Sequence, residues 1–236
     1  MFGKFSLISR HSFTMSSLFH CIIQISSKPA FFLEFNSVKS SNYGRLVAKM
    51  KTIVLVGVPG CGKSSILKET VRQIPSVVVV NYGDKMLEEA ALTGITRDTL
   101  RKMPLSAQQE IGIKAAKKLI RQQEQIAIID THALIRTEIG FCPGLPKEVL
   151  HILSPRALVW IECQPFLILQ RRMNDSSRTR DEETEEELLL HQELVRSYLA
   201  ACSMETGALL CRLSNSDLSL ENNCQPLVRL VRQLSK

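Results

Sequence analysis

The first eight of nine consecutive residues follow the spacing G-x-x-x-x-G-K-S, in which glycines, a lysine and a serine stand at fixed positions. The nine are Gly57, Val58, Pro59, Gly60, Cys61, Gly62, Lys63, Ser64 and Ser65. Glycines let backbone N–H groups surround a chain of phosphates, because no Cβ stands in the way. In this arrangement Lys63 reaches the outer phosphates and the Ser64 hydroxyl binds Mg²⁺. The pattern predicts a phosphate-binding loop for a nucleoside triphosphate.

The residues on either side of the loop predict the elements that position it. Residues 52–58 form an apolar, β-branched run that predicts a buried strand, and residues 63–73 have a helical pattern. A helix that begins at the loop points the positive end of its dipole at the bound anion. The order strand, loop, helix therefore favours a phosphate site over a chance glycine-rich turn.

A carboxylate ends the apolar run 126–130, which predicts a second buried strand. In a parallel sheet, Asp130 then lies at the same edge as the loop and binds Mg²⁺, partly through water. The next residue is Thr131, so the chain lacks the neighbouring Glu that activates water in many hydrolytic ATPases. No N-K-x-D or T-K-x-D sequence, which reads guanine, occurs in the chain. Hydrolytic ATPases and GTPase switches are therefore disfavoured.

Two arginines, Arg178 and Arg180, lie close together in the polar segment 175–181. Guanidinium groups spaced in this way can converge on a phosphoryl group and neutralise the charge that develops during its transfer. Transfer between two nucleotides also requires the exclusion of water, so we expect this segment to form a lid. The acidic run 181–187 that follows is expected to stabilise the N-terminus of a helix.

Downstream of Met50, apolar runs alternate regularly with helical patterns. The predicted strands are 52–58, 77–81, 126–130, 157–162 and 208–213, and the predicted helices are 63–73, 83–92, 106–123, 146–153, 165–173, 183–204 and 220–234. Ser106 and Gln109, after Pro104, have the spacing of a capping box. Nearly continuous apolar strands separated by helices indicate a doubly wound α/β fold, with a parallel five-stranded sheet flanked by helices on both faces.

The net charge of +7 is unevenly distributed along the 236 residues. Residues 1–49 hold six Lys or Arg and one acidic residue, so they account for +5 of it. The high charge is therefore no indication of a nucleic-acid-binding face. The same segment is rich in Ser and Phe without a sustained hydrophobic period, and we expect an extension outside the fold. A transit peptide is the alternative, because the segment is basic and nearly free of acids.

Seven cysteines, at positions 21, 61, 142, 163, 202, 211 and 224, are scattered, and none forms a C-x-x-C pair. This pattern argues against a disulfide scaffold and a structural zinc site, and it favours a reducing compartment such as the cytoplasm. Cys61 lies inside the phosphate-binding loop. We expect its thiol to fill space there, and a reactive thiol is the alternative.

Several short sequences, taken in order along the chain, resemble those of the archaeal-type adenylate kinases. They are Val80–Met86, Arg97–Lys102, Asp130–His132, Arg136–Thr137 and Gly140–Pro146. The resemblance continues through Arg178 and Arg180 to the turn at Thr206–Ala208 and covers essentially Met50–Leu234. It implies that residues 50–236 form an adenylate kinase-like P-loop domain and that residues 1–49 lie outside it. The implied reaction is reversible transfer of the γ-phosphoryl group of MgATP to AMP, giving two ADP.

The resemblance also implies roles for individual residues. The loop Gly57–Ser65 is expected to bind ATP, and Ser64 and Asp130 to hold Mg²⁺. The residues expected on the AMP side are Gly83, Asp84, Arg97, Arg101, His132 and Arg136, with Arg136 and one of the other two arginines on the AMP phosphate. The expected catalytic residues are Lys63, Arg136, Arg172, Arg178 and Arg180, with Arg171 as the alternative to Arg172. For His132, a structural hydrogen-bonding role is an equal alternative. The four-ligand zinc lid of bacterial relatives is missing, so we expect a short, metal-free lid and no zinc.

Two other functions stay open. The first is a kinase for UMP or CMP, since no residue of the sequence reads the base directly. The second is an ATP-bound assembly factor or switch, whose arginines would dock a protein or RNA. Arginines that converge on the transferring group favour the enzyme. The expected partners are ATP, AMP and ADP, with neither nucleic acid nor membrane, in a monomer or small homo-oligomer of the cytoplasm.

Overall fold

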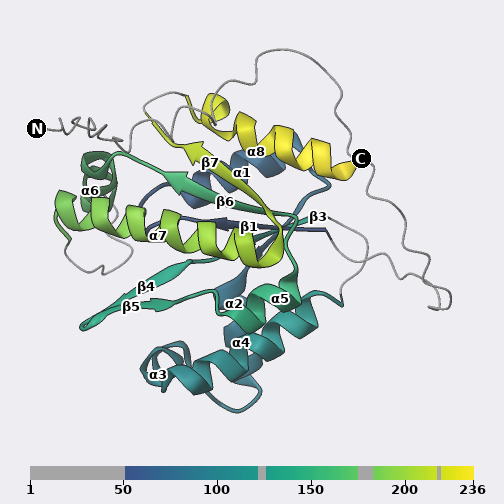
Figure 1. Ribbon diagram of the computed structural model, residues 1–236, viewed down its shortest axis with the longest axis vertical. Coiled ribbons are helices and arrows are strands. Elements are labelled where there is room, and N and C mark those ends of the chain that lie inside the picture. The colour runs from purple at the N-terminus through teal and green to yellow at the C-terminus, as the bar shows by residue number, and fades with distance from the viewer. Residues whose placement is uncertain (1–50, 122–125, 175–182, 217–218) are drawn as a thin grey trace, which may run out of the picture. The chain divides into compact units, whose positions relative to one another are not determined.

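The computed structural model describes residues 51–121, 126–174, 183–216 and 219–236, apart from the side chains of residues 97, 98 and 101. Its central sheet contains β1 (Lys51–Val56), β2 (Val78–Asn81), β3 (Ile126–Asp130), β6 (Ala157–Glu162) and β7 (Leu209–Ser214). All neighbouring strands are parallel, and their order is β2-β3-β1-β6-β7. The strand that leads into the phosphate-binding loop is therefore the central one (Figure 1).

Helices cover both faces of this sheet. The helices are α1 (Lys63–Gln73), α2 (Tyr82–Ala91), α3 (Arg97–Lys102), α4 (Leu105–Leu119), α5 (Lys147–Leu153), α6 (Pro165–Met173), α7 (Glu185–Thr206) and α8 (Leu220–Ser235). Figure 1 shows α1 and α8 together on one face and α7 on the other. Alternate residues of β1 enter the two cores: Ile53 and Leu55 pack with α1 and α8, whereas Val54 and Val56 pack with α4, α5 and α7. A strand that is buried on both faces reads as a continuous apolar run, which is what the sequence contains.

The predicted doubly wound α/β fold is confirmed. The bounds of β3, β6, α1 and α6 agree with the sequence prediction residue for residue. The predicted capping box at Ser106 is wrong, because α4 begins at Leu105 after Pro104 and has no side-chain cap. The side chain of Gln108 instead donates a hydrogen bond to the carbonyl of Met103 over 2.9 Å.

One helix and one hairpin were not predicted. The helix is the short α3, and the hairpin is antiparallel and consists of β4 (Leu134–Thr137) and β5 (Gly140–Pro143). The hairpin contacts α7 through β4 and lies outside the main sheet. Its strands have four residues each, too short for the alternation of apolar and polar residues to stand out from a loop.

Helix α7 has well-defined ends. Thr184 caps its N-terminus, and Thr184 and Glu187 form a capping box, so part of the acidic run stabilises a helix start as predicted. At the other end, Gly207 adopts a left-handed φ of 68° and its N–H donates to the carbonyl of Ser203. Among the described residues, no helix is long and apolar enough to cross a membrane.

The left-handed cap of α7 is testable. Gly207→Ala is expected to lower the free energy of unfolding by about 1–2 kcal/mol, because a Cβ is strained at this φ. A Cβ added to Gly207 would have no atom beyond the chain neighbours within 4 Å, so the cost is one of backbone conformation. Denaturant unfolding measures it, and Gly207→Asn, which tolerates this conformation better, is the control. Equal stability of the Ala variant and the wild type would contradict this account.

Candidate active site

The phosphate-binding loop connects β1 to α1 at the carboxyl edge of the sheet. Gly60 and Gly62 have φ values of 93° and 92°, a region that favours glycine. Gly62 is the N-cap of α1, and within the described chain no side chain caps this helix and no acid lies in its first turn. The backbone N–H groups at the start of α1 and the positive end of its dipole are therefore suited to an anion.

Side chains from elsewhere in the chain hold the carbonyl oxygens of this loop. Arg172 donates from Nε and Nη2 to the carbonyl of Pro59 over 3.0 and 2.8 Å. Asn215 donates from Nδ2 to the carbonyl of Cys61 over 2.7 Å, and Arg171 approaches the same oxygen at 3.4 Å. In a trans peptide the N–H points away from the carbonyl. These contacts therefore direct the N–H groups of Gly60 and Gly62 away from Arg172 and Asn215.

Lys63 is folded back onto its own loop. Its Nζ donates to the carbonyl of Gly57 over 2.8 Å and lies 3.4 Å from Nε2 of His132. The structure thus brings together two residues that were predicted for opposite sides of the site, the ATP side and the AMP side. Both roles of His132, at the acceptor and as a structural hydrogen-bonding partner, stay predictions.

Asp130 borders the loop from the neighbouring strand. It lies in register with Leu55 of β1 and with Asn81 of β2, and its Oδ2 is 3.5 Å from Nδ2 of Asn81. Ser64, the other predicted Mg²⁺ residue, lies in the first turn of α1 and is exposed. Across the described ranges, no group of three or more His, Cys, Asp or Glu side chains could hold a metal by itself.

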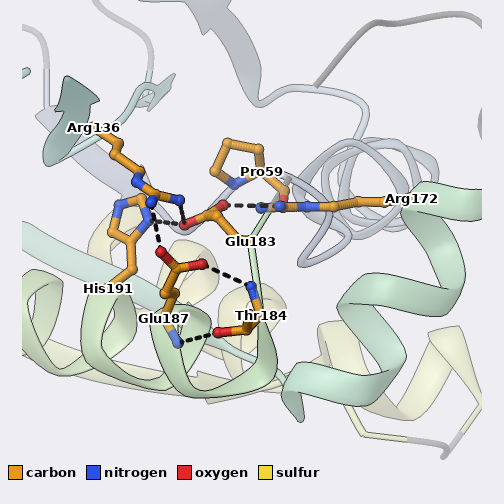
Figure 2. A network of polar contacts seen from close by, with 7 residues as sticks. All are labelled: Pro59, Arg136, Arg172, Glu183, Thr184, Glu187 and His191. Atoms are coloured by element: carbon orange, nitrogen blue, oxygen red, sulfur yellow. Dashed lines mark hydrogen bonds and ion pairs between the residues drawn. The ribbon is translucent and has the colours of Figure 1, made fainter. Parts of the chain in front are cut away.

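Two predicted arginines share one carboxylate. Glu183 Oε2 accepts from Nη1 of Arg172 at 2.8 Å, and Glu183 Oε1 lies 3.5 Å from Nη1 of Arg136 (Figure 2). Arg136 also donates to Glu187 over 2.6 Å, and Glu187 in turn accepts from the N–H of Thr184. The backbone hydrogen bond from Thr184 and the nearby Arg136 lower the pKa of Glu187, so this carboxylate is charged at neutral pH.

The residues predicted for the AMP side lie on other elements. Gly83 and Asp84 are in the first turn of α2, where the N–H of Asp84 donates to Asn81 Oδ1 over 3.1 Å. Arg97 and Arg101 belong to α3, and their side chains lie outside the described part. A cavity of about 70 Å³ opens between α2, α4 and β5, lined in part by Tyr82, Met86, Gln108, Gln109, Cys142 and Pro143. Arg178 and Arg180 lie outside the described residues.

Cys61 is fully buried, with 0% of its surface exposed. A Cβ built on Gly57 would lie 2.5 Å from its Sγ, so the thiol fills the space beside that glycine. Burial raises the pKa of the Cys61 thiol, although Lys63 opposes this shift. The structure therefore favours a filling role over a reactive thiol.

Three residues that hold the site together were not predicted: Asn81, Glu183 and Asn215. Asn81 ends β2 and Asn215 follows β7. Like Asp130, both therefore stand at the carboxyl edge of the parallel sheet, where the phosphate-binding loop lies, and this position could have indicated them from the sequence. From the sequence, Glu183 was assigned, together with the other acids of the run 181–187, only the role of stabilising a helix N-terminus. Its partners Arg172 and Arg136 lie on α6 and β4, and no local feature of the sequence marks Glu183 as the carboxylate that they share.

A central parallel strand, a glycine-rich loop that carries a lysine, and a helix N-terminus directly after it define the P-loop class of nucleotide-binding proteins. A family model described as an AAA domain matches residues 56–189. An adenylate kinase of Pyrococcus furiosus is 40% identical over 184 residues, which cover 76% of this chain and 94% of that protein. One of Methanopyrus kandleri is 39% identical over 187 residues, covering 77% of this chain and 98% of that protein. The chain belongs to the adenylate kinase family.

One solved structure is similar to this chain in fold, at a sequence identity too low to indicate a shared function. The shikimate kinase of Bacteroides thetaiotaomicron matches with a TM-score of 0.52 and 13% sequence identity, covering 78% of this chain and 99% of that one. The resemblance to adenylate kinases inferred from the sequence is confirmed by the relatives.

The close approach of Gly57 and Cys61 gives a test of the loop. Gly57→Ala is expected to destabilise the protein by about 1–3 kcal/mol, because the new methyl overlaps Sγ of Cys61. Cys61→Ala in the same chain removes Sγ and should restore part of the loss, so that the two changes are not additive. Thermal unfolding and ATP titration of both single variants and the double variant measure this. Strict additivity would contradict the packing described.

Proposed function

We propose that this chain catalyses reversible transfer of the γ-phosphoryl group of ATP to AMP, giving two ADP. The observation that carries the proposal is that two arginines from different elements, Arg172 of α6 and Arg136 of β4, meet at the carboxylate of Glu183 beside the phosphate-binding loop. Transfer between two nucleotides brings two highly charged phosphate chains together, and several cations must neutralise them. The relatives are named adenylate kinases, which supports AMP as the acceptor.

On the donor side, the proposed roles follow from the loop. The N–H groups of Gly60 and Gly62 and the start of α1 bind the phosphates of ATP. Lys63 exchanges the carbonyl of Gly57 for a phosphate oxygen, which is a better acceptor because it is charged. Arg172, tied to the loop through Pro59, lies beside the transferring group. The transfer is proposed to be in line, without a covalent intermediate.

Mg²⁺ is the proposed cofactor. The Ser64 hydroxyl and the Asp130 carboxylate are hard oxygen donors of the kind that Mg²⁺ prefers, and Asp130 borders the loop through its register with Leu55. Two protein ligands fit a metal that keeps several waters and takes phosphate oxygens as further ligands. When bound, the metal would neutralise charge on the β- and γ-phosphates.

On the acceptor side, the cavity between α2, α4 and β5 is the proposed place of the nucleobase. Its lining combines apolar side chains with the amides of Gln108 and Gln109, a composition that suits a planar base with hydrogen-bonding edges. The residues proposed to bind AMP are Gly83, Asp84, Arg97, Arg101, His132 and Arg136. Arg178 and Arg180 stay proposed lid residues that close over the phosphoryl group.

ATP, AMP and ADP are the proposed partners, in a monomer or small homo-oligomer of the cytoplasm without nucleic acid or membrane. Residues 50–236 are the proposed catalytic domain, with residues 1–49 as an extension.

A transfer assay tests the function. ATP and Mg²⁺ are incubated with AMP, UMP, CMP or GMP, and the diphosphate formed is measured; we expect AMP to be the preferred acceptor. Lys63→Ala is the control, and it should lose at least about 10²–10³-fold in kcat while its Tm stays unchanged, because the lysine neutralises charge in the transition state. Preference for UMP or CMP would identify the alternative kinase. ATP binding without any transfer would identify the assembly factor or switch.

Deletion of residues 1–49 tests the domain proposal. All strands of the central sheet begin at Lys51 or later, so we expect kcat to be unchanged. The expected change in Tm is below about 2 °C, which corresponds to less than about 1 kcal/mol in a domain of this size. A larger fall in Tm would show that the segment packs on the domain. Import of a reporter fused to residues 1–49 into an organelle would support the transit alternative.

A further inference from the structure

Glu183 is the carboxylate on which the arginines of the site meet. Only 6% of its side chain is exposed, and 9% of the side chain of Arg172. Its two oxygens have separate partners: Oε2 binds Arg172, whereas Oε1 lies 3.5 Å from Arg136 and 3.4 Å from Nδ1 of His191 (Figure 2). The carboxylate therefore spans two guanidinium groups and sets the distance between them.

Both arginines are held by further contacts. Arg172 of α6 uses Nε and Nη2 on the carbonyl of Pro59, which leaves Nη1 for Glu183. Arg136 of β4 uses Nη2 on Glu187. The result is a continuous series of contacts from the phosphate-binding loop through Arg172 and Glu183 to the hairpin.

The surroundings limit the freedom of this carboxylate. His191, buried on α7, contacts Oε1 and packs against the ring of Phe141 on β5, with ring centroids 4.8 Å apart. Two guanidinium groups this close would repel each other without the carboxylates between them. Glu183, itself shielded from solvent, thus compensates the charge of the buried Arg172 and of the partly exposed Arg136 and holds both guanidinium groups in place.

We propose that Glu183 is a positioning residue for phosphoryl transfer. It holds Arg136 and Arg172 at a spacing at which both contact the phosphates where donor and acceptor meet. This inference rests on the function proposed above. Glu183 does not bind either nucleotide, so its loss should affect the ternary arrangement more than the affinity for ATP or AMP alone. A displacement of reacting groups by about 1 Å can cost about 10²-fold in rate.

Glu183→Gln tests the proposal, because the amide keeps the shape but replaces one acceptor by a donor that faces a guanidinium group. Glu186→Gln is the matched control, with the same loss of charge at an exposed position of the first turn of α7. We measure kcat, the Kd of ATP alone, the Kd of AMP alone, and the Kd of diadenosine pentaphosphate, which joins two adenosines through five phosphates and spans both sites.

In Glu183→Gln we expect kcat to fall about 10- to 100-fold and the Kd of the dinucleotide to rise about tenfold or more. The Kd values of ATP and AMP should stay within about threefold of the wild type, and Glu186→Gln should match the wild type throughout. If Glu183→Gln does not fold, Glu183→Asp provides the same test, because it keeps the charge but withdraws the carboxylate by one methylene from the two guanidinium groups.

Unchanged kcat and dinucleotide affinity would overturn the proposal. Equal weakening of all three ligands would also overturn it, because that pattern indicates a merely structural role. Wild-type protein is assayed first: if it forms no ADP from ATP and AMP, the proposed function fails and the inference fails with it. If the wild type is active and Glu183→Gln equals it, the inference alone fails.

Discussion

The site depends on one constraint: the carbonyl oxygens of the phosphate-binding loop must be bound on the outside of the loop. A loop that turns its N–H groups toward an anion turns its carbonyls away, and buried carbonyls without donors are costly. Arg172 and Asn215 supply these donors from α6 and from the residue after β7. These contacts support the loop in a shape suited to phosphate, which lowers the reorganisation that binding requires.

The same arginine that supports the loop also extends the site toward the acceptor. Arg172 contacts both the carbonyl of Pro59 and the carboxylate of Glu183, and Glu183 reaches Arg136 on the hairpin. Support of the loop and arrangement of the cations are thus one connected set of contacts. Substitution of Arg172 would remove both at once, so a loss of activity in such a variant would not by itself identify a contact with phosphate.

How much could be predicted from the sequence depends on how local the signal is. The loop 57–65, the strand that ends in Asp130 and the main α/β pattern are encoded in short stretches with fixed spacing or sustained hydrophobicity, and these predictions agree with the structure. The hairpin and α3 are short and were missed. The pairing of Glu183 with Arg136, far apart in the sequence, and of Asn215 with Cys61, 154 residues earlier, arises only from the tertiary fold. No periodic pattern reports such contacts.

The contact between Asn215 and Cys61 has a consequence for the order of events during synthesis. Asn215 is itself held by Asn223 of α8, so the support of the first loop comes from the last elements of the chain. When β1, the loop and α1 of a nascent chain have emerged from the ribosome, Asn215 and Asn223 have not yet been synthesised, so the loop still lacks this support. The loop therefore gains its full support for ATP only when nearly the whole domain has emerged. The nucleotide would then stabilise the completed domain and would not assist the early steps of its folding.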